Sequence, residues 1–224
     1  RSELSDEDWS LCAAMFTDEP HLASDSHASY GRGQQFSPLV QAEFRRRRGY
    51  LIEDFIADIY FNSPTSSATR FDFYETLHEL WFENFCLPME AWCQKNNLPL
   101  TGHYLEHDWP CPYATPGHMH LLAHMDWPGT DLLECFLLEG HEFGDPQNLD
   151  AAAVGTEPHA LHYLKQVQSV ANQFGKERVM NESWGAGGHD STPVDWLRIG
   201  RFLAVHGVNL FVPHVSPTTI RGAR

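Results

Sequence analysis

The residues best able to do chemistry are acidic side chains that follow short apolar runs. Glu182 follows the run at 179–180 after one intervening residue, Asn181, and precedes a glycine-rich stretch at 185–188. Asp18 and Glu19 follow a second apolar run and precede a proline. Because glycine and proline interrupt a strand, these acids are expected where strands end. In an α/β barrel the catalytic side chains collect at that edge.

A third group of polar residues follows the apolar run at 98–105. It consists of Glu106, His107, Asp108 and Trp109. In an extended chain Glu106 and Asp108 point to opposite sides, so only one of them faces the barrel axis easily. We favour Glu106 there, as a reserve for the other acids.

Paired carboxyl groups suit the cleavage of a glycosidic bond. One carboxylic acid protonates the leaving oxygen and one carboxylate activates water or attacks the sugar, while aromatic rings stack on sugar faces. The leading candidate for acid or base is Glu182, and Glu19 is its expected partner. The alternative is that Glu182 only caps the glycine-rich loop and Glu19 only forms a turn. Expected substrate contacts are Asp18, Glu106, His107, Asp108, Trp109, Asp131, Asn181, Trp184 and His214.

Acids that share one cleft repel one another, which favours a bound cation. Oxygen ligands of this kind prefer calcium or magnesium, so calcium is the expected companion. Zinc is the rival, because His118, His120 and His124 form H-x-H-x3-H and the last two share a helical face. This group follows a loop at 112–117 and not an apolar strand, as zinc hydrolysis would need. The sequence therefore favours calcium over zinc.

The amino-acid composition excludes some classes of binding partner. The 224 residues carry a formal net charge of −15, so nucleic acid and anionic membranes are disfavoured by repulsion. The sequence contains no apolar run of the ~20 residues needed to span a bilayer. Five scattered cysteines lack a CxxC pair, which argues against a disulfide framework and a structural zinc site. A carbohydrate substrate fits this balance.

The elements that must position these residues alternate between strand and helix. Such alternation predicts a parallel sheet or barrel. Strands are expected at 11–16, 98–105, 178–180 and 208–214, and the region at 126–138 holds either a strand or a packed loop. Helices are expected at 43–61 (interrupted at Gly49), 69–95 (kinked by Pro88), 117–125, 159–174 (capped by Gly175) and 194–205 (opened by Thr192 and Pro193).

Several of these motifs together resemble the catalytic barrel of bacterial α-L-rhamnosidases of glycoside hydrolase family 106. They are Phe-Thr-Asp-Glu-Pro at 16–20, the helix beginning Arg-Phe-Asp-Phe-Tyr at 70–74, Thr-Gly-His at 101–103, Pro-Gly-Thr-Asp at 128–131, Asn-Glu at 181–182 and Asn-Leu-Phe-Val-Pro-His at 209–214. The resemblance implies a (β/α)8 barrel in a large multidomain enzyme, an inverting mechanism and calcium at the sugar. It also implies that the acids at 18–19 and Glu182 are active-site groups.

We therefore expect residues 1–224 to form a single partial (β/α)8 TIM-type barrel, incomplete at one or both ends. The rest of its own multidomain chain would be its partner, and an exported bacterial enzyme is favoured. One alternative is a β-galactosidase-like retaining glycosidase, with Glu182 as acid/base and the nucleophile outside this chain. The others are a zinc-dependent hydrolase and a sugar-binding relative without catalysis.

Overall fold

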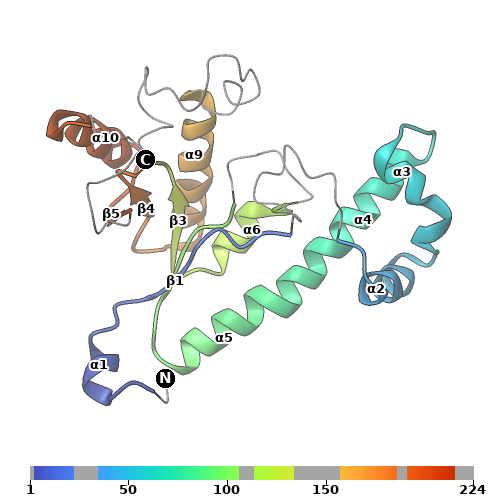
Figure 1. The fold of residues 1–224 in the computed structure, drawn as a ribbon, viewed down its shortest axis with the longest axis horizontal. Helices are drawn as coiled ribbons and strands as arrows, with labels where there is room; N and C mark the ends of the chain where they lie inside the picture. Colours follow the sequence, from blue (N-terminus) through green and yellow to red (C-terminus); the bar gives the residue numbers. More distant parts are fainter. Residues whose placement is uncertain (1–2, 23–34, 106–113, 134–156, 186–190, 215–224) are drawn as a thin grey trace, which may run out of the picture.

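Five parallel strands form one curled sheet at the centre of the molecule (Figure 1). The computed structural model describes residues 3–22, 35–105, 114–133, 157–185 and 191–214. The strands are β1 (Met15–Thr17), β2 (Leu100–Gly102), β3 (Trp127–Asp131), β4 (Met180–Ser183) and β5 (Leu210–Pro213).

The strand order in the sheet, β1-β2-β3-β4-β5, is also the order along the chain, and every neighbouring pair is parallel. Adding each strand to the same edge is the winding of a barrel, whereas a doubly wound sheet reverses direction. Cα atoms of β2 and β4 approach within 8 Å although β3 lies between them. In a flat sheet they would be about 9.5 Å apart. The sheet is thus a half-barrel flanked by helices.

The connections between strands are helical. Between β1 and β2 lie α2 (Pro38–Arg48), the 3-10 turn η1 (Ile52–Phe55), α3 (Ile56–Tyr60), α4 (Ser66–Trp81), the π-helical turn η2 (Phe82–Cys86) and α5 (Leu87–Lys95). Then α6 (His118–Ala123) precedes β3, α9 (Glu157–Phe174) precedes β4 and α10 (Pro193–Val205) precedes β5, while α1 (Asp6–Ser10) lies before β1. Among the described residues, no helix is both long and apolar enough to cross a membrane.

The apolar side chains form two separate cores. The larger core packs the sheet against α5, α6, α9 and α10, and includes the fully buried Leu122, Leu164 and Leu203. The smaller core joins α2, η1, α3 and α4 around Phe44 and Phe73. We call α2, η1, α3 and the first turns of α4 the helical arm. Figure 1 shows this arm at the end of the long α4–α5 helix that points away from the sheet.

The predicted helices are confirmed, with shifted boundaries. The first begins earlier than expected, at Pro38, because Ser37 caps it by accepting a hydrogen bond from the Val40 N–H, and it ends at Gly49 in the left-handed conformation. Near Pro88, where the sequence predicts a kink, the long helix contains a π-helical turn that ends two residues before the proline. Proline lacks the N–H that a regular helix would bond to the carbonyl of Asn84, so the helix widens there.

The predicted strands needed more correction. The first strand is displaced toward Thr17, and the second ends at Gly102 instead of residue 105. The third is β3, in the region at 126–138 that the sequence leaves open between a strand and a packed loop, since Pro128 and Gly129 do not favour a strand. Sheet pairing overrides that local preference: Gly129 pairs with Met180 of β4 and Pro128 with Gly102 of β2. The prediction that Glu182 follows its strand is also wrong, since β4 continues to Ser183.

Gly102 decides how closely β1 and β2 approach. Its φ is +116°, and an added Cβ would lie 2.0 Å from the carbonyl oxygen of Thr17. The same oxygen accepts a hydrogen bond from the His103 N–H at 3.0 Å. A glycine here therefore places His103 directly beside the end of β1.

Candidate functional site

Six polar side chains come from the carboxyl ends of the five strands, and we call them the strand-edge cluster. Its members are Asp18 and Glu19 after β1, His103 after β2, Asp131 at the end of β3, Glu182 in β4 and His214 after β5. Ligand atoms of Asp18, His103 and Glu182 lie within 4.8 Å of one another. The same is true of Glu19, His103 and Asp131. The parallel sheet thus gathers four carboxylates around one imidazole.

His103 is the buried centre of this cluster. Its side chain is 0% exposed, and its Nε2 lies 3.0 Å from Glu182 Oε2 and 3.7 Å from Asp18 Oδ1. An ionised carboxylate has no proton to give, so His103 Nε2 donates this hydrogen bond. The ring of Phe16 meets the imidazole edge to face at 5.6 Å. Glu182 is therefore held in place by a hydrogen bond with a buried histidine.

Glu182 has a second imidazole beside its other oxygen. His214 Nε2 lies 4.0 Å from Glu182 Oε1, and the His214 N–H donates to the Ser183 carbonyl at 2.8 Å. His214 continues the pairing of β5 with β4, which brings its ring to this edge. Glu182 thus lies between a buried and a half-buried histidine.

Asp18 is the carboxyl group in the cluster with a raised pKa. The loss of hydration is the main cause of the raised pKa, and His103 opposes it. The neighbouring charges of Glu182, Glu19 and Asp131 add to it. The direction means that Asp18 retains a proton more readily than an ordinary aspartate does.

Two residues at strand ends have a left-handed backbone, although neither is glycine. The φ of Glu19 is +43° and that of Trp184 is +64°. Such conformations store strain and cluster at functional sites. The carbonyl of Glu19 is held by the ring of His21, whose Nδ1 lies 2.7 Å away. The backbone at both strand ends is therefore bent away from a regular extension.

Trp184 and Asn181 contact other parts of the fold. Trp184 stacks on Phe211 at 5.4 Å, and its Nε1 donates to the carbonyl of Trp196 at 3.0 Å, so its ring lies in the packing between β5 and α10. Asn181 is fully buried, and its Oδ1 accepts from the Leu132 N–H at 3.1 Å. Side chains alternate along a strand, so Asn181 occupies the opposite face of β4 from Glu182. Neither residue reaches the strand-edge cluster.

Glu182 and Asp131 are neighbours across the sheet. They are paired in register, so their side chains leave the same face. Asp131 is buried. Of the substrate contacts expected from the sequence, Glu106, His107, Asp108 and Trp109 lie outside the described residues.

Sequence reasoning missed His103 as a site residue. The predicted strand at 98–105 places His103 within the strand and away from its end. In the structure β2 ends at Gly102, so His103 is the first residue after the strand. A polar side chain directly after a glycine was the available signal. The rival histidines do not all converge, since His118 Nδ1 contacts Gln166 Oε1 at 2.6 Å while His120 contacts His78 at 3.0 Å.

Comparison with known proteins gives one informative likeness. No protein-family model matches the chain, and no curated protein does so either. The structure of a rhamnosidase from Novosphingobium sp. PP1Y is similar, with a TM-score of 0.55 and 21% sequence identity over 81% of this chain. The similar region is 16% of that rhamnosidase chain. At this identity the likeness shows the fold alone, which is a rhamnosidase-like α/β half-barrel.

Proposed function

We propose that this chain is part of the catalytic barrel of a glycoside hydrolase that removes a terminal, α-L-rhamnoside-like sugar. The observation that carries the proposal is the convergence of Asp18, Glu19, Asp131 and Glu182 around His103 at the carboxyl edge of the sheet. Carboxyl groups in such an arrangement supply the acid and base that glycosidic cleavage requires. The five strands would belong to a (β/α)8 barrel whose remaining strands come from the same, longer protein.

Glu182 is the proposed general base. The hydrogen bond with His103 holds this carboxyl group in place, and a general base accepts a proton from an attacking water. Glu19 is the proposed partner. Asp18 is the second candidate for the acid, because its raised pKa favours the protonated form that a leaving oxygen needs.

A calcium ion fits the donor set of the cluster. Carboxylate oxygens are the ligands that calcium prefers, and a cation would relieve the repulsion that helps to raise the pKa of Asp18. Asp131 would hold it together with whichever of Asp18 and Glu19 does not act as the acid. Bound there, the ion would orient sugar hydroxyls and neutralise the acids, leaving the proton transfers to the side chains.

The test is the hydrolysis of an aryl α-L-rhamnoside by the full-length protein. Glu182→Gln removes the base while keeping its shape, so kcat is expected to fall at least about a hundredfold. Glu177→Gln is the matched control, because that carboxylate is 78% exposed and lies outside the cluster. Turnover that survives Glu182→Gln would overturn the proposal. Saturable rhamnose binding without any hydrolysis by the unmodified protein would favour the sugar-binding alternative.

A further inference from the structure

A second cluster of side chains, most of them histidines, lies where α6 packs against the long helix α4–η2–α5. It contains His78 of α4, Phe82 of η2, Glu90 of α5, His120 of α6 and His124 directly after α6. We call it the histidine cluster. We propose that His78, His120 and His124 bind one zinc-class transition-metal ion that ties α6 to the long helix.

The first argument is the spacing of two ring nitrogens. His78 Nε2 lies 3.0 Å from His120 Nδ1, and His78 Nδ1 lies 2.9 Å from the carbonyl oxygen of Pro116. A carbonyl only accepts, so His78 Nδ1 carries the proton and Nε2 directs its lone pair toward His120. Two nitrogens bound to one tetrahedral zinc at ~2.0–2.1 Å are about 3.3 Å apart. The pair is already close to the spacing that a shared ion requires.

The second argument is the orientation of the third imidazole. His124 Nδ1 lies 2.8 Å from Glu90 Oε2, which leaves Nε2 of His124 for a metal. The ring centre of His120 lies 5.2 Å from that of His78 and 5.5 Å from that of His124. Metal-ligating histidines almost always donate their other N–H to a carboxylate or carbonyl. His78 and His124 both have such a partner.

The helices also supply favourable spacings for a metal. His120 and His124 are four residues apart, so both leave the same face of α6. Glu75 precedes His78 by three residues, a Glu-x-x-His spacing that helix-borne metal sites use, and its charge acts on His120. Glu75 or a water would complete a tetrahedral set.

Packing holds these rings in place. Phe82 stacks on His120 at 4.4 Å and meets His124 edge to face at 4.7 Å. Phe82 belongs to the π-helical turn, a distortion that is frequent at functional sites. Gly117 allows the loop before α6 to approach His78, because an added Cβ would lie 2.4 Å from the imidazole. Binding an ion would still require the third ligand to turn toward the His78–His120 pair, because the described side chains here do not bring three ligand atoms within 4.8 Å of one another.

The donor set separates this site from the strand-edge cluster. Imidazole suits zinc, copper and nickel, whereas carboxylate oxygen suits calcium. His118, which the sequence groups with His120 and His124, is not part of the site because it is buried against Gln166 of α9. The proposed ion is structural, and it does not depend on the proposed glycosidase activity.

The experiment is a titration of the metal-free, full-length protein with zinc, followed by calorimetry and by the absorption of substituted cobalt. Binding at this site is expected with one equivalent and with a higher melting temperature. His120→Asn is expected to weaken zinc at least about a hundredfold. Glu90→Gln removes only the orienting partner of His124 and should weaken zinc about 10- to 100-fold. His206→Asn is the matched control, since His206 contacts Phe202 at the end of α10.

Zinc that binds equally well to the wild type, His120→Asn and Glu90→Gln would overturn the proposal and leave a hydrogen-bonded histidine pair. Absence of saturable zinc binding would also overturn it. Glu182→Gln separates the two sites, because it alters the strand-edge cluster alone. A loss of zinc in Glu182→Gln with retention in His120→Asn would assign the ion to the strand edge, against the proposal.

Discussion

At the scale of single residues, the neighbours of each carboxyl group decide what it can do. Glu182 accepts a bond from a buried histidine, whereas the pKa of Asp18, less than 4.8 Å away, is raised by the loss of hydration and by the neighbouring acids. The two acids therefore have different surroundings, and those of Asp18 favour its protonated form. Grouping acids in this way lowers stability, and such a loss is expected where a site serves function.

Asp18→Asn should raise stability at neutral pH. In the folded protein the pKa of Asp18 is raised above its ordinary value of 3.8, so its ionisation disfavours folding as the pH rises through that interval. The gain should therefore be full above the folded pKa and vanish below about 3.8. Since the side chain is 78% exposed, water limits the gain to less than about 1 kcal/mol. Thermal melts in EDTA at pH 7 and pH 3 measure it.

Glu177→Gln is the control for this series, because its exposed carboxylate lies outside the cluster. A melting temperature of Asp18→Asn that falls below the wild type at pH 7 would contradict the assignment of a raised pKa.

At the scale of elements, the short strands are stabilised by hydrogen bonds to neighbouring strands, whereas helices are stabilised by the residues that cap their ends. The strands have only three to five residues each. They rely on close approach, as at Gly102, and β2, β3 and β4 also have a paired strand on each side. The helix α10 is instead fixed locally, because Thr192 and Asp195 form a reciprocal capping box at its start.

Gly102→Ala should be severely destabilising. The new methyl group would overlap the Thr17 carbonyl, and φ of +116° is a conformation that alanine avoids. We expect a loss of more than about 3 kcal/mol in chemical denaturation, with β1 displaced from β2. Gly175→Ala is the control, since it also has a positive φ but open space around its Cβ, and it should cost only about 1–2 kcal/mol. Equal losses in the two variants would argue against the close approach.

Thr192→Ala should lower the free energy of unfolding by about 1 kcal/mol. The substitution removes the hydroxyl that accepts from the Asp195 N–H and donates to its carboxylate at 2.6 Å. Thr192→Ser keeps that hydroxyl and should behave like the wild type. Urea unfolding of the three proteins compares them, and a serine variant as unstable as the alanine variant would refute the capping role.

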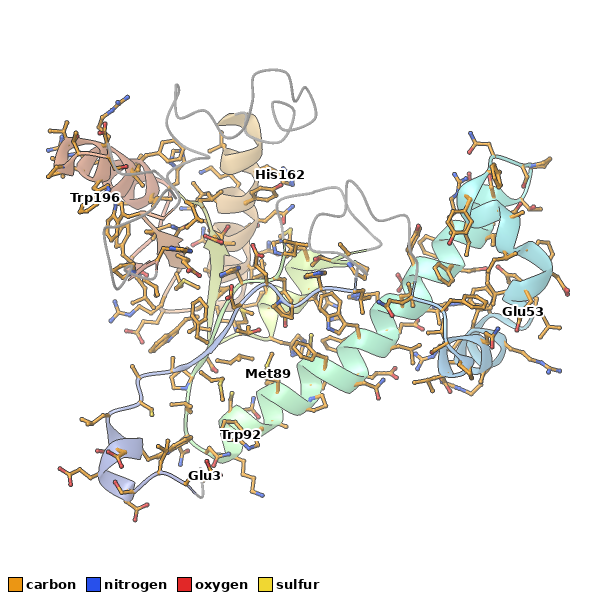
Figure 2. The ribbon with its side chains drawn as sticks, viewed as in Figure 1. Glu3, Glu53, Met89, Trp92, His162 and Trp196 are labelled. Atoms are coloured by element: carbon orange, nitrogen blue, oxygen red, sulfur yellow. The ribbon has the colours of Figure 1, made fainter. Side chains whose placement is uncertain are left out.

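At the scale of the whole molecule, the two hydrophobic cores belong to different parts of the fold. The half-barrel carries the strand-edge cluster, and the helical arm extends from it with its own buried centre around Phe44 and Phe73 (Figure 1). In Figure 2 the side chains of the arm, where Glu53 is labelled, lie far from those around His162 on α9. The arm should therefore open independently of the sheet.

Phe44→Ala should unfold the helical arm and spare the sheet. Phe44 is 0% exposed, and truncating such a ring typically costs 3–5 kcal/mol. Hydrogen exchange should accelerate in α2 and α3 while β3, β4 and β5 keep their protection. Leu39→Ala on the same helix is the control, because Leu39 is 59% exposed. Simultaneous loss of protection in the strands would show that the two cores unfold together.

The sequence by itself determined the features that depend on local interactions. Gly49 and Gly175 end helices because they can adopt a positive φ, and Thr192 begins one because its hydroxyl satisfies a free N–H. The alternation of apolar runs predicted a parallel α/β architecture. Glu182 was identifiable because an acid at the end of a buried run is itself a local pattern.

Only the tertiary structure decided which side chains meet. The third strand contains Pro128 and Gly129, and it becomes a strand because β2 and β4 pair with it from both sides. His103 reaches Glu182, 79 residues away, because Gly102 ends β2 early against β1. Asn181 is next to Glu182 in the chain but faces away from it, since the sheet sets which side each residue occupies. Pairing between strands that are distant in the sequence fixes these positions, and local residue preferences carry no information about that pairing.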